Sequence, residues 1–168
     1  MTNPHAPSEA DIAAYFQRYQ AGVAAVVDAL AGATDADLDR HADVEGAWSA
    51  RKVVHHLADS ETNSYVRLRR LLAEPAGTTI AGYDEAHWAD VLAYDRPIEK
   101  SLAVFVAVRE SSTELLGALL PTFTPETWSK VAQHSESGDY TLFDWLRIYA
   151  EHGEAHAAQI ERARAGIA

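Results

Sequence analysis

The sequence contains no cysteine among its 168 residues, and this absence removes several kinds of chemistry at once. Without thiols the chain has no disulfide, no cysteine nucleophile and no thiolate metal site. A chain that needs no disulfide suits a reducing compartment, so we expect a cytoplasmic protein. Any metal site in this chain must therefore use imidazole or oxygen ligands.

Basic residues are scarce. The 14 Lys and Arg residues are outnumbered by 25 Asp and Glu residues, which gives a formal net charge of -11 at pH 7. Such a chain repels the phosphates of nucleic acids, and no stripe of Lys and Arg compensates for this. We therefore expect no nucleic-acid partner, and we interpret the surplus acidic residues as a solvated surface.

Long hydrophobic runs are also missing. The absence of any stretch of about 18 apolar residues argues against a membrane span. The first residues, MTNPHAPSEADIAAYF, lack the basic start and apolar core of a secretory signal, so we expect none. A content of 48% hydrophobic and 23% charged residues is ordinary for a globular protein, and the length predicts a single domain over residues 1–168.

Four long helices are predicted from apolar residues that recur three and four positions apart. Their expected N-caps are Ser8, Ser49, Asp95 and Thr141, of which the first and last begin capping boxes. The predicted helices cover residues 8–31, 49–74, 95–120 and 141–165.

The segments between these helices predict only short elements. Short helices are expected over residues 36–38, 84–92 and 124–132, and any strands should be confined to a small pair near Gly138. Four amphipathic helices bury their apolar stripes together in an all-α four-helix bundle, which is the fold class we predict. The second and third inter-helix connections are long, so a simple up-down-up-down order is not required.

Two histidines lie four residues apart in the predicted last helix. The segment YAEHGEAHAAQIERA places His152 and His156 on the same flank of that helix's apolar face. They are either two half-buried residues hydrogen-bonded to their neighbours, or two ligands of a single metal ion. The zincin signature is excluded, because Gly153 rather than glutamate follows His152.

A third histidine occupies a similar position on the predicted second long helix. His56 shares one flank of that helix with Ser60, Asn63 and Arg67, as one wall of a small pocket requires. Three imidazoles with an open position form a Zn²⁺ site of the catalytic type, and Ni²⁺ or Fe²⁺ is equally compatible with imidazole. His55 is turned about 100° away on the helical wheel, and we expect it to point toward solvent.

Other polar residues are weaker candidates. Glu61 falls near the centre of the apolar face, so its carboxylate is either paired with Arg67 or Arg109 or kept for proton transfer. Glu61 and Arg67 are therefore the candidate catalytic residues. His134, in the loop before the last helix, is a further candidate for the pocket. No G-x-S-x-G elbow provides a serine nucleophile.

Several segments together resemble the DinB/YfiT-like family. They are GAWSARKVVHHLADSETNSYVR, YDEAHWADVLAY with PIEKSLAVF, and HSESG followed by YAEHGEAHAAQI, which occur in the family's order over roughly residues 46–165. The closer similarity is to the YfiT-like branch, whose members resemble bacillithiol S-transferases and were earlier labelled metal-dependent hydrolases.

The resemblance implies a four-helix bundle, often a homodimer, with nickel or zinc held by three histidines. The matching positions are His56, His152 and His156, while Ala155 and Gln159 stand where some relatives have extra imidazoles. It further implies that a low-molecular-weight thiol and a small electrophile are the substrates. Hydrolysis by an activated water and a non-catalytic metal site remain alternatives. Aromatic residues expected to be exposed in the second connection also favour a dimer: Tyr83, Trp88 and Tyr94.

Overall fold

The computed structural model describes residues 7–167, which form a bundle of four long helices, as predicted. The long helices are α1 (Glu9–Leu30), α3 (Ala50–Ala73), α5 (Glu99–Leu119) and α7 (Leu142–Ala165). Capping boxes begin α1 at Ser8 and α7 at Thr141, and the Ser49 side chain caps α3. These ends agree with the predicted ones because each cap satisfies backbone N–H groups that the helix itself leaves unpaired.

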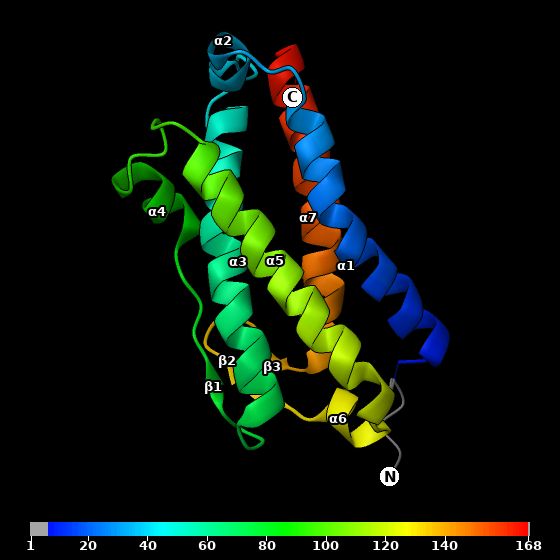
Figure 1. The fold of residues 1–168 in the computed structure, drawn as a ribbon. Coiled ribbons are helices and arrows are strands. Elements are labelled where there is room, and N and C mark those ends of the chain that lie inside the picture. The colour runs from blue at the N-terminus through cyan, green and yellow to red at the C-terminus, as the bar shows by residue number, and fades with distance from the viewer. Residues whose placement is uncertain (1–6, 168) are drawn as a thin grey trace.

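The helices do not follow a simple up-down-up-down order. In Figure 1, α1 and α7 run in one direction and α3 and α5 in the other. The principal contacts join α1 to α7, α7 to α3 and α3 to α5, with a smaller contact from α5 to α1. Helices α1 and α3 therefore lie diagonally across the bundle, as do α5 and α7. This order places α3 beside α7, the two helices on which the candidate histidines lie.

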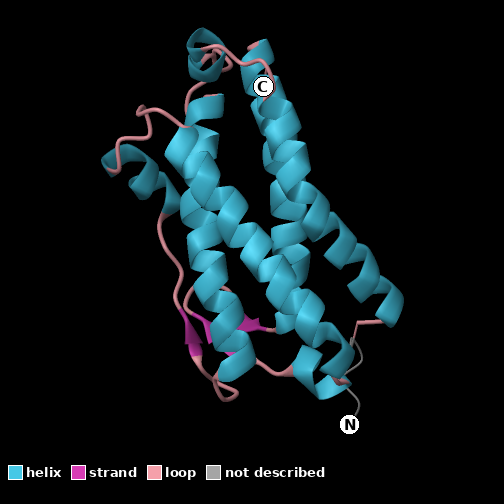
Figure 2. Cartoon of the chain, in the orientation of Figure 1, coloured by secondary structure: helices cyan, strands magenta, loops and turns pink. Residues whose placement is uncertain are grey.

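Short elements complete the chain between the long helices. The structure has the helices α2 (Asp35–Asp39), α4 (Glu85–Val91) and α6 (Pro125–Ser129), and a 3₁₀ turn, η1 (Leu120–Thr122). Strands β2 (Ala132–His134) and β3 (Gly138–Tyr140) form the expected antiparallel pair. A third strand, β1 (Thr79–Ile80), pairs in parallel with β2 and was not predicted, since two residues show no periodicity. Figure 2 shows these strands together at one end of the bundle.

The predicted cap at Asp95 is wrong. Helix α5 begins at Glu99, and its N-cap, Ile98, makes no side-chain cap hydrogen bond. Asp95 belongs instead to a turn in which Ala93 has a positive φ of 52° and the Arg96 side chain donates to the carbonyls of Leu92 and Ala93. The tertiary turn, rather than a local cap, sets where this helix starts.

The aromatic residues of the second connection are less exposed than expected. Tyr94 is buried, and its hydroxyl donates to Asp59 Oδ2 at 2.5 Å. Tyr83 and Trp88 are half-buried against each other, with ring centroids 4.5 Å apart.

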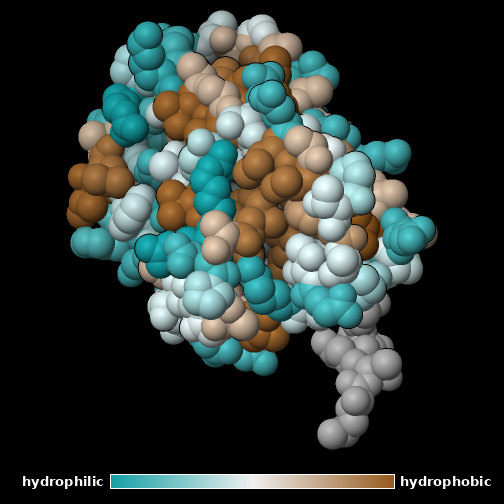
Figure 3. All heavy atoms as spheres, turned by 60° about the horizontal axis from the view of Figure 1, so that its bottom comes forward, coloured by the Kyte–Doolittle hydropathy of each residue, from teal (hydrophilic) through white to brown (hydrophobic). Residues whose placement is uncertain are grey.

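Elsewhere, Figure 3 shows hydrophobic and hydrophilic residues interspersed over the face turned to the viewer. No helix within residues 7–167 has the length and hydrophobicity to cross a membrane.

One arginine connects all four long helices. Arg109 of α5 donates from Nε to the carbonyl of Tyr19 on α1, from Nη1 to Glu61 Oε1 on α3, and from Nη2 to the carbonyl of Tyr149 on α7. Both Arg109 and Glu61 are fully buried. A buried charge is tolerated only when it is paired and hydrogen-bonded, and the Arg109 guanidinium meets both conditions. Glu61 is paired through Oε1, while its Oε2 atom has no hydrogen-bond partner among the described residues.

Candidate metal centre

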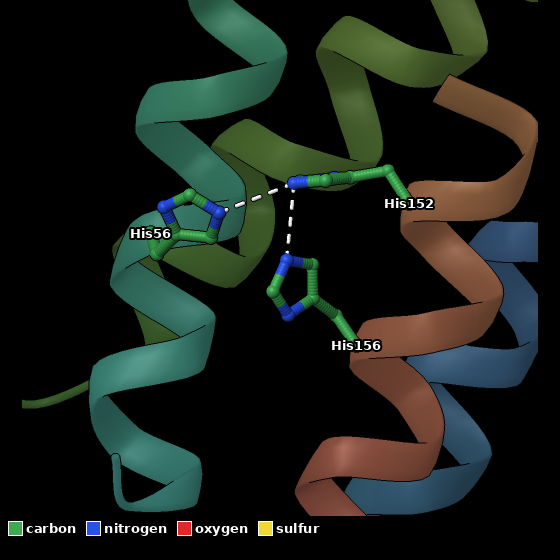
Figure 4. A group of neighbouring side chains, drawn as sticks. All are labelled: His56, His152 and His156. Carbon is green, nitrogen blue, oxygen red and sulfur yellow. Dashed lines mark hydrogen bonds between the residues drawn. The ribbon is translucent and has the colours of Figure 1, made fainter. Parts of the chain in front are cut away.

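Three histidine side chains converge between α3 and α7 (Figure 4). His56 Nε2 lies 3.1 Å from His152 Nε2, and His156 Nε2 lies 3.0 Å from the same atom. Two nitrogens bound to one Zn²⁺ at about 2.0–2.1 Å in tetrahedral geometry are about 3.3 Å apart. These spacings are close to those of ligands of one ion, and the three imidazoles form a group that could hold a metal ion within the described part of the chain.

The protonation of this cluster also suits a cation. His156 Nδ1 donates to Gln159 Oε1 at 2.7 Å, so the Nε2 atom of the neutral ring carries the lone pair that faces the other histidines. A second hydrogen bond of this kind orients metal-binding histidines in many proteins. The Nδ1 atoms of His56 and His152 are buried and find no partner among the described residues.

Burial keeps all three rings neutral. It lowers the pKa of His56 to about 4 and, together with the nearby His56, lowers the pKa of His156 to about 4. Burial also lowers the pKa of His152 well below its usual value, and repulsion from the neighbouring His156 and His56, were they protonated, adds to this effect. Neutral imidazole is the form that binds metal, so the cluster needs no deprotonation at neutral pH.

The histidines lie at the base of an open pocket of about 330 Å³. Trp48 packs edge-on against His56 with ring centroids 5.2 Å apart. Besides the three histidines and Gln159, the lining includes one carboxylate, that of Glu85. Glu85 Oε2 lies 3.5 Å from His56 Nε2, and the side chain is 60% exposed. An acidic group at the mouth of the pocket is available both to ligands and to solvent.

Glu85 was missed in the sequence. It is the first residue of α4, after the N-cap Asp84, and α4 packs against α3. In the segment YDEAHW it resembles any acidic residue of a helix's first turn, which the helix dipole favours. Only the path of the connection between α3 and α5 shows that it faces the histidines.

The other candidate residues of α3 lie outside the pocket lining. Glu61 forms the ion pair with Arg109, one of the two partners considered. Burial raises the pKa of Glu61 and the Arg109 guanidinium opposes this, so the paired carboxylate is not placed for proton transfer. Arg67 donates to the Tyr149 hydroxyl at 2.9 Å and to the Ala81 carbonyl at 2.7 Å. Arg67 therefore fixes Tyr149, whose ring centroid is 6.0 Å from that of His152.

Two further candidate positions, Asn63 and His134, take structural roles. Asn63 bonds the Asp59 carbonyl of its own helix, and His134 Nδ1 accepts from the backbone N–H groups of Glu136 and Ser137 in the turn between β2 and β3. Neither residue lines the pocket.

The expected exposure of His55 is wrong. Its ring is turned away from the pocket, but it is fully buried beneath the turn that precedes α5. His55 Nε2 donates to the Arg96 carbonyl at 2.9 Å, and Nδ1 accepts from the Ser101 hydroxyl at 2.7 Å. The helical wheel gave the correct direction, but it contains no information about the connection that covers this side of α3.

A four-helix bundle with three convergent histidines on adjacent helices defines a candidate metalloprotein. A model of the DinB superfamily matches residues 18–160, and the chain belongs to this superfamily. The structure is also similar to that of YfiT from Bacillus subtilis, with a TM-score of 0.80 and 30% sequence identity over 96% of this chain and 91% of that one. YfiT is described as a probable metal-dependent hydrolase with an unusual four-helix bundle topology.

Several relatives carry provisional names as metal-dependent hydrolases. One from Oceanobacillus iheyensis is 40% identical over 68% of this chain, and one from Bacillus mycoides is 34% identical over 71%. A third, from Halalkalibacterium halodurans, is 31% identical over 71% of this chain. The matched region spans slightly less than two thirds of the first two relatives, 64% and 66% of their lengths.

Proposed function

We infer that this protein is a metal-dependent enzyme whose single divalent cation is held by His56, His152 and His156. The observation that carries this proposal is the convergence of three neutral Nε2 atoms at the base of an open pocket. Three protein ligands and an accessible position are typical of catalytic rather than structural zinc sites. Zinc and nickel are the metals we propose, and iron is a third candidate.

The bound cation supplies Lewis acidity, which lowers the pKa of a nucleophile in the open position. The protein contributes orientation and a proton acceptor. Gln159 holds the ring of His156 in the tautomer that presents Nε2 to the pocket. Glu85 Oε2, next to the histidines and open to solvent, takes the proton that the nucleophile loses.

Two nucleophiles fit this arrangement, and we propose a low-molecular-weight thiol as the first. The thiol loses its proton and its sulfur bonds to a small electrophile, which releases its leaving group. This conjugation agrees with the resemblance of the sequence to bacillithiol S-transferases, and the chain has no cysteine of its own to compete for the electrophile. Water is the second candidate, supported by the names of the relatives. Its reaction is the hydrolysis of an ester or amide.

One experiment separates these reactions. The purified protein is loaded with one equivalent of Zn²⁺ or Ni²⁺ and assayed with monochlorobimane plus a panel of small thiols, and separately with p-nitrophenyl acetate. Metal-dependent conjugation without ester cleavage supports S-transfer, and the opposite result supports hydrolysis. Stoichiometric metal binding with neither activity supports the third alternative, a non-catalytic metal-binding protein.

We further propose that the protein acts as a twofold homodimer in the cytoplasm. The family resemblance supports a dimer. Twofold symmetry is the natural choice, because twofold dimers are the commonest oligomers. Two apolar residues at the end of the α4 region, Val91 and Leu92, are 57% and 43% exposed and would be covered in such an assembly. Light scattering at micromolar concentration tests the dimer, and a monomer mass rejects it.

A further inference from the structure

A second cavity continues from the histidine pocket along α7. It has a volume of about 290 Å³ and shares Gly46, Trp48 and Gln159 with the histidine pocket, so the two form one groove. Its walls are mostly apolar and include Val44, Ala163 and Ile167. A ligand that reaches the histidines therefore has room for an apolar part beside Trp48.

The far part of this groove is lined by Arg162, an exposed arginine whose guanidinium has no partner among residues 7–167. The sequence has eleven arginines, and ten of them donate to, or form an ion pair with, another residue of the described chain. Arg162 alone makes no such contact within residues 7–167, although acidic residues outnumber basic ones 25 to 14. Arg164, two residues further along, donates to the carbonyls of Ala29 and Ala31.

The spacing along α7 places Arg162 at a useful distance from the metal centre. It follows His156 by six residues, which corresponds to about 9 Å along a helix that rises 1.5 Å per residue. Gln159 lies between them, and its Oε1 atom is used by His156 Nδ1, so its amide N–H groups remain for a ligand. The groove thus has imidazoles at one end, an amide donor in the middle and a guanidinium at the other end.

We propose that Arg162 is a specificity-determining residue that binds an oxyanion of the substrate, while the reactive group of the same molecule reaches the three histidines. The ligand class is a small molecule with an apolar stem and a terminal carboxylate or phosphate-type group, both of which guanidinium binds with paired N–H donors. Glu45 also lines the groove but forms no ion pair with Arg162. The proposal rests on the metal-dependent function inferred above and names the substrate class for that site.

Matched thiols test the proposal by calorimetry on the zinc-loaded protein. 6-Mercaptohexanoate and 6-mercaptohexan-1-ol share a thiol and a six-carbon stem and differ in the terminal group. We expect the carboxylate to bind about tenfold more tightly, which corresponds to about 1.4 kcal/mol, because a hydrogen bond between two charged groups is stronger than one to a neutral hydroxyl. A phosphonate analogue distinguishes the two anion classes. 3-Mercaptopropionate, which is too short, should show no such advantage.

Variants assign the effect to the residue. Arg162→Gln should remove the preference for the carboxylate without changing the affinity of the alcohol or the zinc content, and Arg162→Lys should restore part of it. Arg147→Gln, an exposed arginine of the same helix that pairs with Asp144 and Glu151, is the control and should behave as the wild type. Equal affinity of the two thiols in the wild type, or a preference that survives Arg162→Gln, overturns the proposal.

A metal-free measurement separates this proposal from the metal-dependent function. Hexanoate, but not hexanamide, should shift the Nε–H resonance of Arg162 in the metal-free protein and leave that of Arg147 in place. If the Arg162 resonance shifts but the protein binds no zinc, the anion site is supported and the proposed metal-dependent function is contradicted. Zinc binding without this shift rejects the anion site alone.

Discussion

At the scale of single residues, the histidine cluster is defined by the ring nitrogen that each histidine directs toward the other two. The three Nε2 atoms meet at 3.0 and 3.1 Å, and the Nδ1 atom of His156 is occupied by Gln159. The positions of His56, His152 and His156 on their helix faces could be predicted, because periodicity fixes direction. The participation of Glu85 could not, since it depends on how a 25-residue connection (residues 74–98) folds back over α3.

Loss of any one of the three histidines should sharply weaken metal binding. Two remaining imidazoles leave the ion with too few protein ligands, so we expect His56→Ala, His152→Ala and His156→Ala each to lower affinity by at least about 100-fold. Equilibrium dialysis with metal analysis by mass spectrometry measures this change. His87→Ala, which removes an exposed histidine of α4, is the control. Wild-type affinity in the triple variant would reject the assigned ligands.

His55→Ala should affect stability rather than metal binding. The substitution leaves the Ser101 hydroxyl and the Arg96 carbonyl without their buried partner, and such losses cost about 1–3 kcal/mol each. We expect a lower midpoint in urea unfolding with the metal stoichiometry unchanged. A variant that loses its metal but keeps its stability would show that His55 belongs to the metal centre.

Glu85→Gln should slow the reaction without releasing the metal. The amide keeps the size of the side chain but cannot accept the proton, and a positioned general base contributes about 10²- to 10⁴-fold. Turnover and metal content are measured on the same sample, with Glu99→Gln, an exposed residue in the first turn of α5, as the control. If Glu85→Gln loses metal instead, the carboxylate is a fourth ligand rather than a base.

At the scale of helices, local signals predict ends well where a side chain forms the cap. Ser8, Ser49 and Thr141 each accept a hydrogen bond from a backbone N–H three residues later, so short-range sequence was sufficient. The start of α5 and the strand β1 depend on tertiary contacts instead. The Arg109 network is a third case, since Glu61 could be paired with either of two arginines until the order of the helices around the bundle was known.

Two glycine substitutions test how tightly Arg109 is held. A Cβ atom at Gly22 would lie 2.8 Å from Arg109 Nη2, whereas one at Gly117 meets only Phe16 at 3.9 Å. Both glycines lie inside helices, where alanine is intrinsically favoured by about 0.5–1 kcal/mol. We expect Gly117→Ala to stabilise the protein and Gly22→Ala to destabilise it, because three hydrogen bonds prevent the guanidinium from moving aside. Equal stabilisation of both variants in thermal unfolding would show that Arg109 is free to shift.

At the scale of the whole molecule, the order of the helices decides where chemistry can occur. Because α1 lies diagonally from α3, and α5 from α7, the histidines of α3 and α7 face each other across a shared edge, and Arg109 reaches all four helices from α5. Amphipathic stripes predict that four helices form a bundle, but they do not specify which helices become neighbours, because an apolar stripe packs against any helix of suitable shape. The sequence therefore predicts the fold class, while the order around the bundle requires the structure.

The buried ring of His56 and the half-buried rings of His152 and His156 also make the stability of the metal-free protein depend on pH. In the unfolded chain histidine titrates near 6.5, whereas the folded pKa values of His56 and His156 are about 4. Between these values the unfolded chain binds more protons than the folded one, so stability should fall as the pH is lowered from 6.5 toward 4. Each pKa unit between the folded and unfolded states corresponds to about 1.4 kcal/mol, so the free energy of unfolding should decrease by a few kcal/mol.

Comparison of two metal-free proteins isolates this effect from the carboxylates that also titrate in acid. The wild type and the triple variant His56→Gln/His152→Gln/His156→Gln are unfolded in urea at intervals from pH 7.5 to pH 4.5. The free energy of unfolding of the wild type should fall more steeply below pH 6.5, because glutamine does not titrate. Stoichiometric zinc should flatten the upper part of the wild-type curve, since the cation binds only the folded, neutral rings and adds to stability by mass action. Parallel curves for the two metal-free proteins would show that the three rings are solvated and titrate normally when folded, which contradicts their burial at the base of the pocket.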